Sequence, residues 1–110
     1  MEGWYRKQAT RVFQERLEAL LPRFERLGVS APKWTIKNLK TRWGSCTEAG
    51  TITLNLKLIQ VPKRAMDYVL VHELCHLVEH NHSQRFYLLL DRMMPDWRTR
   101  RQHLNRDDVS

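Results

Sequence analysis

The segment from Pro62 to Glu79 constrains the fold most, because it has the pattern of one amphipathic helix. It contains no Gly and no internal Pro, and Pro62 stands where a helix tolerates proline, in its first turn. Apolar residues recur along it at helical spacing: Ala65, Met66, Val69, Leu70, Leu74, Leu77 and Val78. We therefore predict a helix whose apolar side packs into a core and whose opposite side carries His72 and His76.

The run His72-Glu73-Leu74-Cys75-His76 within this helix is an HExxH motif. Residues four apart lie on one helix face, roughly 6 Å apart along the axis. Two imidazoles so placed can bind one metal ion. Glu73 lies beside that face, where its carboxylate can take a proton from a metal-bound water. Two ligands and an adjacent base predict the core of a zinc hydrolase, and the alternative is an ordinary amphipathic helix with two histidines four apart.

A catalytic zinc site needs a third protein ligand, for which the downstream sequence offers several residues. The candidates are Glu79, His80, His82 and His103. On an unbroken helix His80 would lie about 12 Å along the axis from His72, too far for both rings to reach one ion. His103 is much farther along the chain and is the least favoured. The third ligand is therefore expected after a break that turns the chain back.

Residues 81–83 carry the signals for that break. Asn81 tolerates the left-handed conformation that ends helices, and Ser83 is expected to cap a new helix from Gln84 to about Met93. His82 stands between the two signals, where a returning chain can direct it at the metal. This favours His82 over His80, which like Glu79 could instead hold a ligand ring by its second nitrogen.

The remaining pattern predicts an α+β fold. An amphipathic segment over 4–27 ends near Gly28 and is expected to kink at Pro22. Strands are predicted at about 33–38, 41–47 and 51–56, with 48–50 as a hairpin loop, and a basic helix over 96–106 follows Pro95. We expect a zincin-like minimal domain: an N-terminal helix, a small antiparallel sheet of about three strands, the HExxH helix and two C-terminal helices.

Length, hydropathy and cysteine content indicate the number of domains and the cellular compartment. The chain has 110 residues, which suits one domain spanning 1–110. No apolar run is long enough to cross a membrane. The two cysteines, Cys46 and Cys75, give no disulfide framework and are expected to be small buried hydrophobes. We predict a reduced, cytoplasmic protein, and the sequence predicts no oligomeric state.

Several segments together resemble the YgjP-like metallopeptidase family, which is similar in its metal core to the SprT-like and WLM zinc peptidases. They are Asn38-Leu39-Lys40-Thr41-Arg42-Trp43-Gly44-Ser45-Cys46, the HExxH motif, Asn81-His82-Ser83-Gln84-Arg85-Phe86-Tyr87 and Met94-Pro95-Asp96-Trp97. The resemblance runs from about Trp4 to Leu104. It implies a peptidase with Zn²⁺ on His72, His76 and His82, and with Glu73 as the base for attack by a zinc-bound water.

The resemblance also implies how much of a family member this chain represents. Members commonly have an additional β-rich region upstream, and we expect either a naturally short form or the C-terminal catalytic part of a longer protein. In peptidases of this type an edge strand commonly pairs with an extended peptide substrate. Arg42, Trp43 and Gly44 are therefore predicted to bind substrate, with Gly44 permitting close backbone approach. The equally weighted alternative is that Trp43 packs the sheet on a helix.

The sequence does not identify the group that stabilises the oxyanion. Tyr87, Arg85, His80 and Arg42 are the candidates, and Tyr87 is also counted as a possible substrate-binding residue. Each has a structural alternative, such as core packing for Tyr87.

Two other functions compete with a peptidase. The formal charge of +7 and basic–aromatic pairs such as Arg42-Trp43 and Trp97-Arg98 suggest weak nucleic-acid binding. The similarity to SprT-like proteins, some of which act on DNA-bound proteins, implies such a role as an alternative. A structural zinc domain is the other alternative, and it requires a fourth protein ligand.

Overall fold

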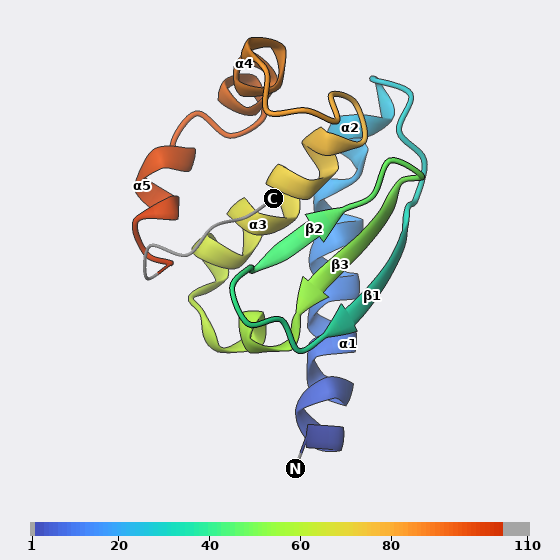
Figure 1. Cartoon of the computed structure of the whole chain (residues 1–110), viewed down its shortest axis with the longest axis vertical. Coiled ribbons are helices and arrows are strands. Elements are labelled where there is room, and N and C mark those ends of the chain that lie inside the picture. Colours follow the sequence, from blue (N-terminus) through green and yellow to red (C-terminus); the bar gives the residue numbers. More distant parts are fainter. Residues whose placement is uncertain (1, 105–110) are drawn as a thin grey trace.

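A computed structural model describes residues 2–104 of the chain, and Figure 1 shows its helices around a small sheet. The elements in chain order are α1 (Glu2–Leu20), α2 (Pro22–Glu25), β1 (Lys33–Lys37), β2 (Gly44–Cys46), β3 (Thr51–Asn55), the 3₁₀ helix η1 (Leu56–Gln60), α3 (Lys63–His76), α4 (Gln84–Met93) and α5 (Trp97–Arg101). The predicted α+β class is confirmed.

The N-terminal helix is divided at Pro22, as predicted. α1 ends at Leu20 and α2 begins at Pro22, which has no N–H to donate to the preceding turn. Gly28, with φ of 86°, follows the last turn. The buried residues of α1 are three or four apart and form one face: Ala9, Phe13, Leu17 and Leu20.

The sheet is mixed, with strand order β1-β3-β2. β2 pairs antiparallel with β3, and the predicted hairpin loop is confirmed, closed by the N–H of Gly50 donating to Thr47 at 2.9 Å. β1 instead runs parallel to β3, with Lys33 opposite Thr51, so the prediction of an antiparallel sheet was wrong for this pair. A tight loop imposes antiparallel pairing on β2, whereas β1 reaches β3 through a long connection that permits the parallel direction.

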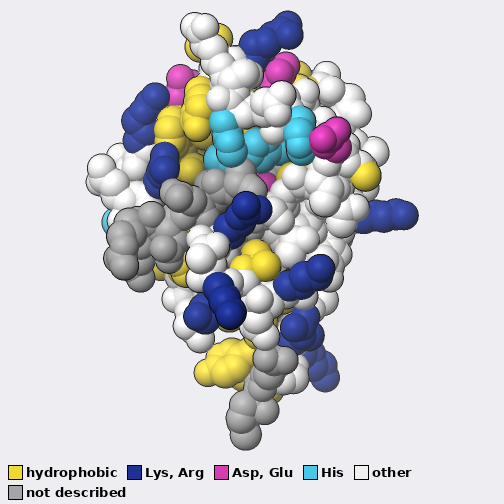
Figure 2. Space-filling model, viewed as in Figure 1, with side chains coloured by type: hydrophobic (Ala, Val, Ile, Leu, Met, Phe, Trp, Pro, Cys, Tyr) yellow, Lys and Arg dark blue, Asp and Glu magenta, His cyan; other side chains and the backbone are white. Residues whose placement is uncertain are grey.

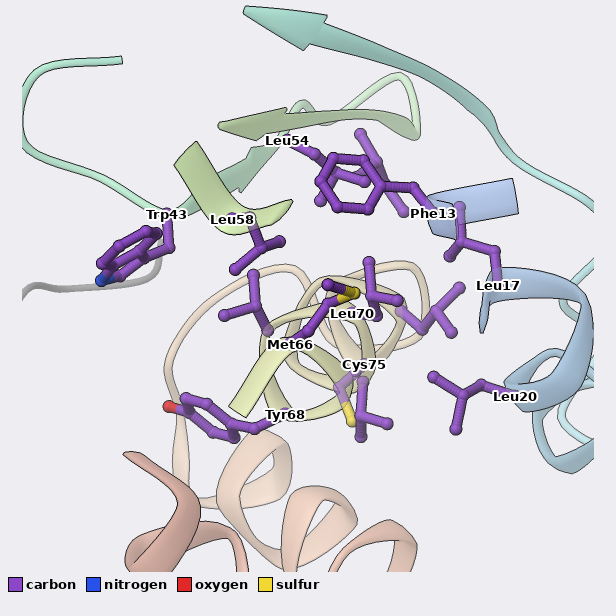
Figure 3. Packing of buried hydrophobic residues seen from close by; sticks show 14 of the residues in the cluster. Phe13, Leu17, Leu20, Trp43, Leu54, Leu58, Met66, Tyr68, Leu70 and Cys75 are labelled. Carbon is purple, nitrogen blue, oxygen red and sulfur yellow. The ribbon is translucent and has the colours of Figure 1, made fainter. Parts of the chain in front are cut away.

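α3 lies at the centre of the molecule, between α1 and the pair α4 and α5 (Figure 1). Its residues from Ala65 to His76 are all buried. In Figure 3 the side chains of Phe13, Leu17 and Leu20 extend from α1 toward those of α3, with Leu54 and Leu58 beside them. No helix within 2–104 is long and apolar enough to cross a membrane.

α3 ends earlier than predicted. Pro62 is its N-terminal flanking residue, but the helix stops at His76 instead of continuing to about Glu79. The N–H of Leu77 donates to Leu74 at 3.0 Å, so the helix tightens into a turn after His76. α5 is also shorter than the predicted 96–106, ending at Arg101, and positions 105 and 106 lie outside the described residues.

Candidate metal centre

Three histidine side chains converge at the C-terminal end of α3. The Nε2 atom of His82 lies 3.2 Å from Nε2 of His72 and 3.1 Å from Nε2 of His76. Zinc–nitrogen bonds of about 2.0–2.1 Å in a tetrahedral site put ligand atoms roughly 3.3–3.4 Å apart. The spacing and the all-imidazole donor set therefore fit a zinc ion, and Figure 2 shows histidine side chains gathered on this face.

The three candidate ligands come from two different parts of the chain. His72 and His76 are buried side chains of α3, while His82 is exposed and comes from the connection to α4. The predicted cap holds this connection, because the hydroxyl of Ser83 accepts a hydrogen bond from the N–H of Phe86 at 3.3 Å. The structure thus brings together the three histidines favoured from sequence.

The rejected ligand candidates lie outside this cluster. Among the described residues, the group of His, Cys, Asp and Glu side chains close enough to share an ion contains the three histidines alone. His80 is exposed, with its ring centroid 6.1 Å from that of His76. Glu79 instead lies 4.0 Å from the guanidinium of Arg85. A fourth protein ligand, which a structural zinc domain requires, is not present in this group.

Aromatic side chains that the sequence reasoning missed support the ligand rings. Phe86 is fully buried and stacks on His76, with ring centroids 4.4 Å apart, and it meets His72 edge-on at 4.9 Å. The Tyr68 hydroxyl lies 3.4 Å from Nδ1 of His72. A ring that binds metal through Nε2 carries its proton on Nδ1 and can donate it to this oxygen. Tyr68 stands four residues before His72, so helical spacing could have indicated it.

Glu73 is a buried carboxylate beside the histidines. It is fully inaccessible to solvent, and neither oxygen has a hydrogen-bond partner in the described part of the chain. Burial raises the pKa of Glu73 well above its ordinary value, and the positive charge of Arg42 opposes that shift. A buried carboxylate without an ion pair among residues 2–104 is available for proton transfer.

Three of the predicted substrate-binding residues lie in or just before β2, and the fourth, Tyr87, lies in α4. Arg42 is exposed and lies two residues before β2, an edge strand. Trp43 belongs to the buried core, which is the packing role weighed as its alternative. Gly44 lies against Glu73. Tyr87 is half-buried, with its ring stacked between those of Trp97 and His82 at centroid distances of 5.9 and 6.1 Å.

Asn55, which sequence reasoning also missed, holds this segment in place. Its buried side-chain amide donates to the carbonyl oxygens of Leu39 at 3.0 Å and Arg42 at 2.7 Å. Its backbone N–H donates to Trp43 at 3.0 Å, and its side-chain oxygen accepts from the N–H of Lys57. One residue at the end of β3 thereby fixes the backbone that leads into β2.

The cysteines and the basic residues do not join the metal cluster. Burial, reinforced by the charge of Glu73, raises the pKa of Cys46 to about 11 and that of Cys75 to about 12. Both are therefore neutral thiols near neutral pH. Two of the C-terminal arginines are engaged within the domain: Arg98 with Asp91 at 3.3 Å and Arg100 with Asp96 at 3.0 Å. Nucleic-acid binding stays a prediction.

Comparison with known proteins agrees with this site. Residues 1–107 match the model of the family described as YgjP-like, metallopeptidase domain. The fold is similar to the metallopeptidase zymogen of Pyrococcus abyssi abylysin, with a TM-score of 0.71 and 26% identity over 86% of this chain and 99% of that one. No curated protein matches the chain. The chain therefore belongs to the YgjP-like metallopeptidase family.

Proposed function

We propose that this domain hydrolyses peptide bonds with zinc held by His72, His76 and His82 and with Glu73 as the general base. The observation that carries the proposal is the convergence of three Nε2 atoms beside a buried carboxylate that is not one of the cluster. Three imidazoles leave a fourth coordination position for water or substrate. When bound, zinc supplies a Lewis acid that lowers the pKa of water toward about 7 and polarises a carbonyl.

Glu73 performs the proton transfers in this proposal. Its oxygens accept no hydrogen bond from the described residues, so they are free to accept one from the attacking water. Glu73 takes the water proton as the oxygen adds to the scissile carbonyl, and then gives it to the leaving nitrogen. The apolar environment strengthens these interactions by excluding bulk water.

The substrate is proposed to lie along β2 as an added strand. β2 is at the edge of the sheet and borders α3, which carries two of the ligands. An extended peptide could pair with its outer edge through backbone hydrogen bonds. Arg42 is the candidate we favour for stabilising the oxyanion, because its exposed guanidinium is near enough to Glu73 for its charge to oppose the rise in the pKa of that carboxyl.

The ligand assignment is tested by a matched pair of variants, His82→Ala and His80→Ala. Zinc content and cleavage of an unfolded protein substrate are measured for both, before and after chelation and zinc addition. We expect His82→Ala to lose activity and most bound zinc, while His80→Ala keeps both. Activity should return to the parent when zinc is added back. Loss of zinc in His80→Ala but not in His82→Ala would refute the assignment.

A further inference from the structure

We propose that Gly44 is a positioning residue for Glu73: the missing side chain on β2 makes the space in which that carboxylate lies. The inference rests on the proposed function, in which Glu73 is the base. It gives Gly44 a different role from the close substrate approach expected from sequence.

A methyl group at Gly44 would make contacts tighter than ordinary ones, so a neighbour would have to move by a few tenths of an ångström. A Cβ built on Gly44 would lie 3.2 Å from Oε2 of Glu73 and 3.3 Å from its Cγ, where ordinary contacts begin at 3.4 Å. On another side it would lie 3.3 Å from the carbonyl oxygen of Thr53, which belongs to the paired backbone of β3. An added methyl group would therefore press on the backbone of β3 on one side, which its strand pairing holds in place, and on the Glu73 side chain on the other.

Backbone conformation does not explain the glycine. Gly28 and Gly50 have positive φ, at 86° and 91°, and Gly44 is not among the glycines in that region. Gly44 pairs with Leu54 in a regular antiparallel register, a conformation that any residue adopts. What distinguishes Gly44 is that the Glu73 side chain lies against the point where a Cβ of residue 44 would be.

Packing is also what holds Glu73 in place. Its oxygens accept no hydrogen bond from the described residues, although it is fully buried. The backbone before Gly44 is fixed by Asn55, which donates to Arg42 and Trp43. Because this backbone is anchored, an added methyl group displaces the carboxylate more readily than the strand. A catalytic group must be held within roughly 0.5 Å of its productive position.

The first test measures steady-state kinetics and zinc content of Gly44→Ala, with Gly3→Ala as the control. A Cβ at Gly3 would meet nothing within 4 Å. We expect kcat of Gly44→Ala to fall roughly 10- to 100-fold, with zinc content and KM close to those of the parent. Gly3→Ala should match the parent. A raised KM with unchanged kcat would instead assign Gly44 to substrate approach and overturn the proposal.

The second test needs no catalysis. The thermal midpoint of the metal-free protein is measured for Gly44→Ala in three backgrounds: the parent, Glu73→Gln and Glu73→Ala. We expect a loss of roughly 5 °C in the first two, where the side chain has its full length, and at most half of that loss with Glu73→Ala. An equal loss in all three backgrounds would show that the methyl group does not meet Glu73.

The two tests separate the inference from the proposed function. If the parent cleaves no peptide, or if Glu73→Gln cleaves as fast as the parent, the proposed function fails and the thermal comparison still measures the contact. If the parent is active, Glu73→Gln is inactive and Gly44→Ala keeps its full kcat, the inference alone fails.

Discussion

Two buried carboxylates on α3 differ in whether they have a hydrogen-bond partner. Asp67, near the start of α3, accepts two hydrogen bonds from Arg16 of α1, from Nε at 2.9 Å and from Nη2 at 2.7 Å. Glu73, less than two turns later, is more deeply buried and accepts none from the described residues. Burying a charge without a partner is unfavourable, whereas a bidentate guanidinium compensates much of that penalty.

This difference fits a structural role for Asp67 and the proposed catalytic role for Glu73. The Arg16–Asp67 pair joins the N-terminal helix to the central helix, so its contribution is to the stability of the fold. Glu73 has no hydrogen-bond partner among the described residues, and its unfavourable burial is consistent with the proposed role of a free base. Five experiments can break or sharpen this contrast.

The largest expected effect is on activity. Glu73→Gln keeps the shape of the side chain but cannot take up a proton, so we expect cleavage to fall by roughly 10²–10⁴-fold with zinc content unchanged. The measurement is hydrolysis of an unfolded protein substrate by protein of matched zinc occupancy. Undiminished cleavage would remove Glu73 from the mechanism.

The same variant should also be more stable without metal. Since the pKa of Glu73 is raised above 4.5, its burial is unfavourable above the raised pKa and carries no such penalty below the ordinary one. The thermal midpoint of metal-free Glu73→Gln should therefore exceed that of the metal-free parent at pH 8, and the gain should shrink toward pH 5. A lower midpoint at pH 8 would indicate that Glu73 has a structural partner.

The second effect is on stability. Arg16→Ala leaves Asp67 buried without its partner, and we expect a loss of about 2–3 kcal/mol, discounted because Arg16 is partly exposed. This corresponds to roughly 10 °C in thermal midpoint, with kcat close to the parent. Arg11→Ala, which breaks the exposed pair with Glu15, is the control and should change the midpoint little. Equal midpoints for the two variants would refute the structural role.

The third effect is on metal affinity. Tyr68 lies between the two carboxylates along α3 and contacts Nδ1 of His72 through its hydroxyl. Tyr68→Phe keeps the stacking on Trp97 but removes the hydroxyl, and we expect zinc affinity to fall about tenfold with little change in stability. Competition with a chromophoric chelator gives the affinity. A loss of stability with unchanged zinc affinity would show that Tyr68 stabilises the fold and does not support metal binding.

The smallest effect is on thiol reactivity. The pKa of Cys46 is raised to about 11 by burial and, second, by the charge of Glu73. Glu73→Gln removes that charge, so alkylation of Cys46 in the folded protein at pH 9 should accelerate a few-fold, because more of the thiol is ionised. The parent at the same pH is the reference. An unchanged rate would mean that Glu73 carries no charge in the folded protein at that pH.

The sequence was informative wherever the signal is local. The HExxH helix, the split at Pro22, the cap at Ser83 and the hairpin loop follow from residues a few positions apart. His82 could be favoured because helix geometry excluded His80. The tightened end of α3 after His76 was missed, since Leu77 and Val78 carry no helix-stopping signal of their own.

The features that depend on distant segments could not be predicted in this way. The parallel direction of β1 and the hydrogen bonds of Asn55 each join parts of the chain that are far apart in sequence. The ring of Phe86 meets His76 only because the chain turns back after α3. Glycine at position 44 was noticed, but its neighbour Glu73 becomes visible only when β2 is placed on α3.

The central place of β3 bears on how the chain folds during synthesis. β1 and β2 both precede β3, yet both pair with it, so neither has its sheet partner until residues 51–55 have been made. The ligands come later still. We therefore expect β1 and β2 to stay unpaired in the newly made N-terminal half. We expect the zinc-binding centre to form only after the sheet has formed and α3 has packed against it.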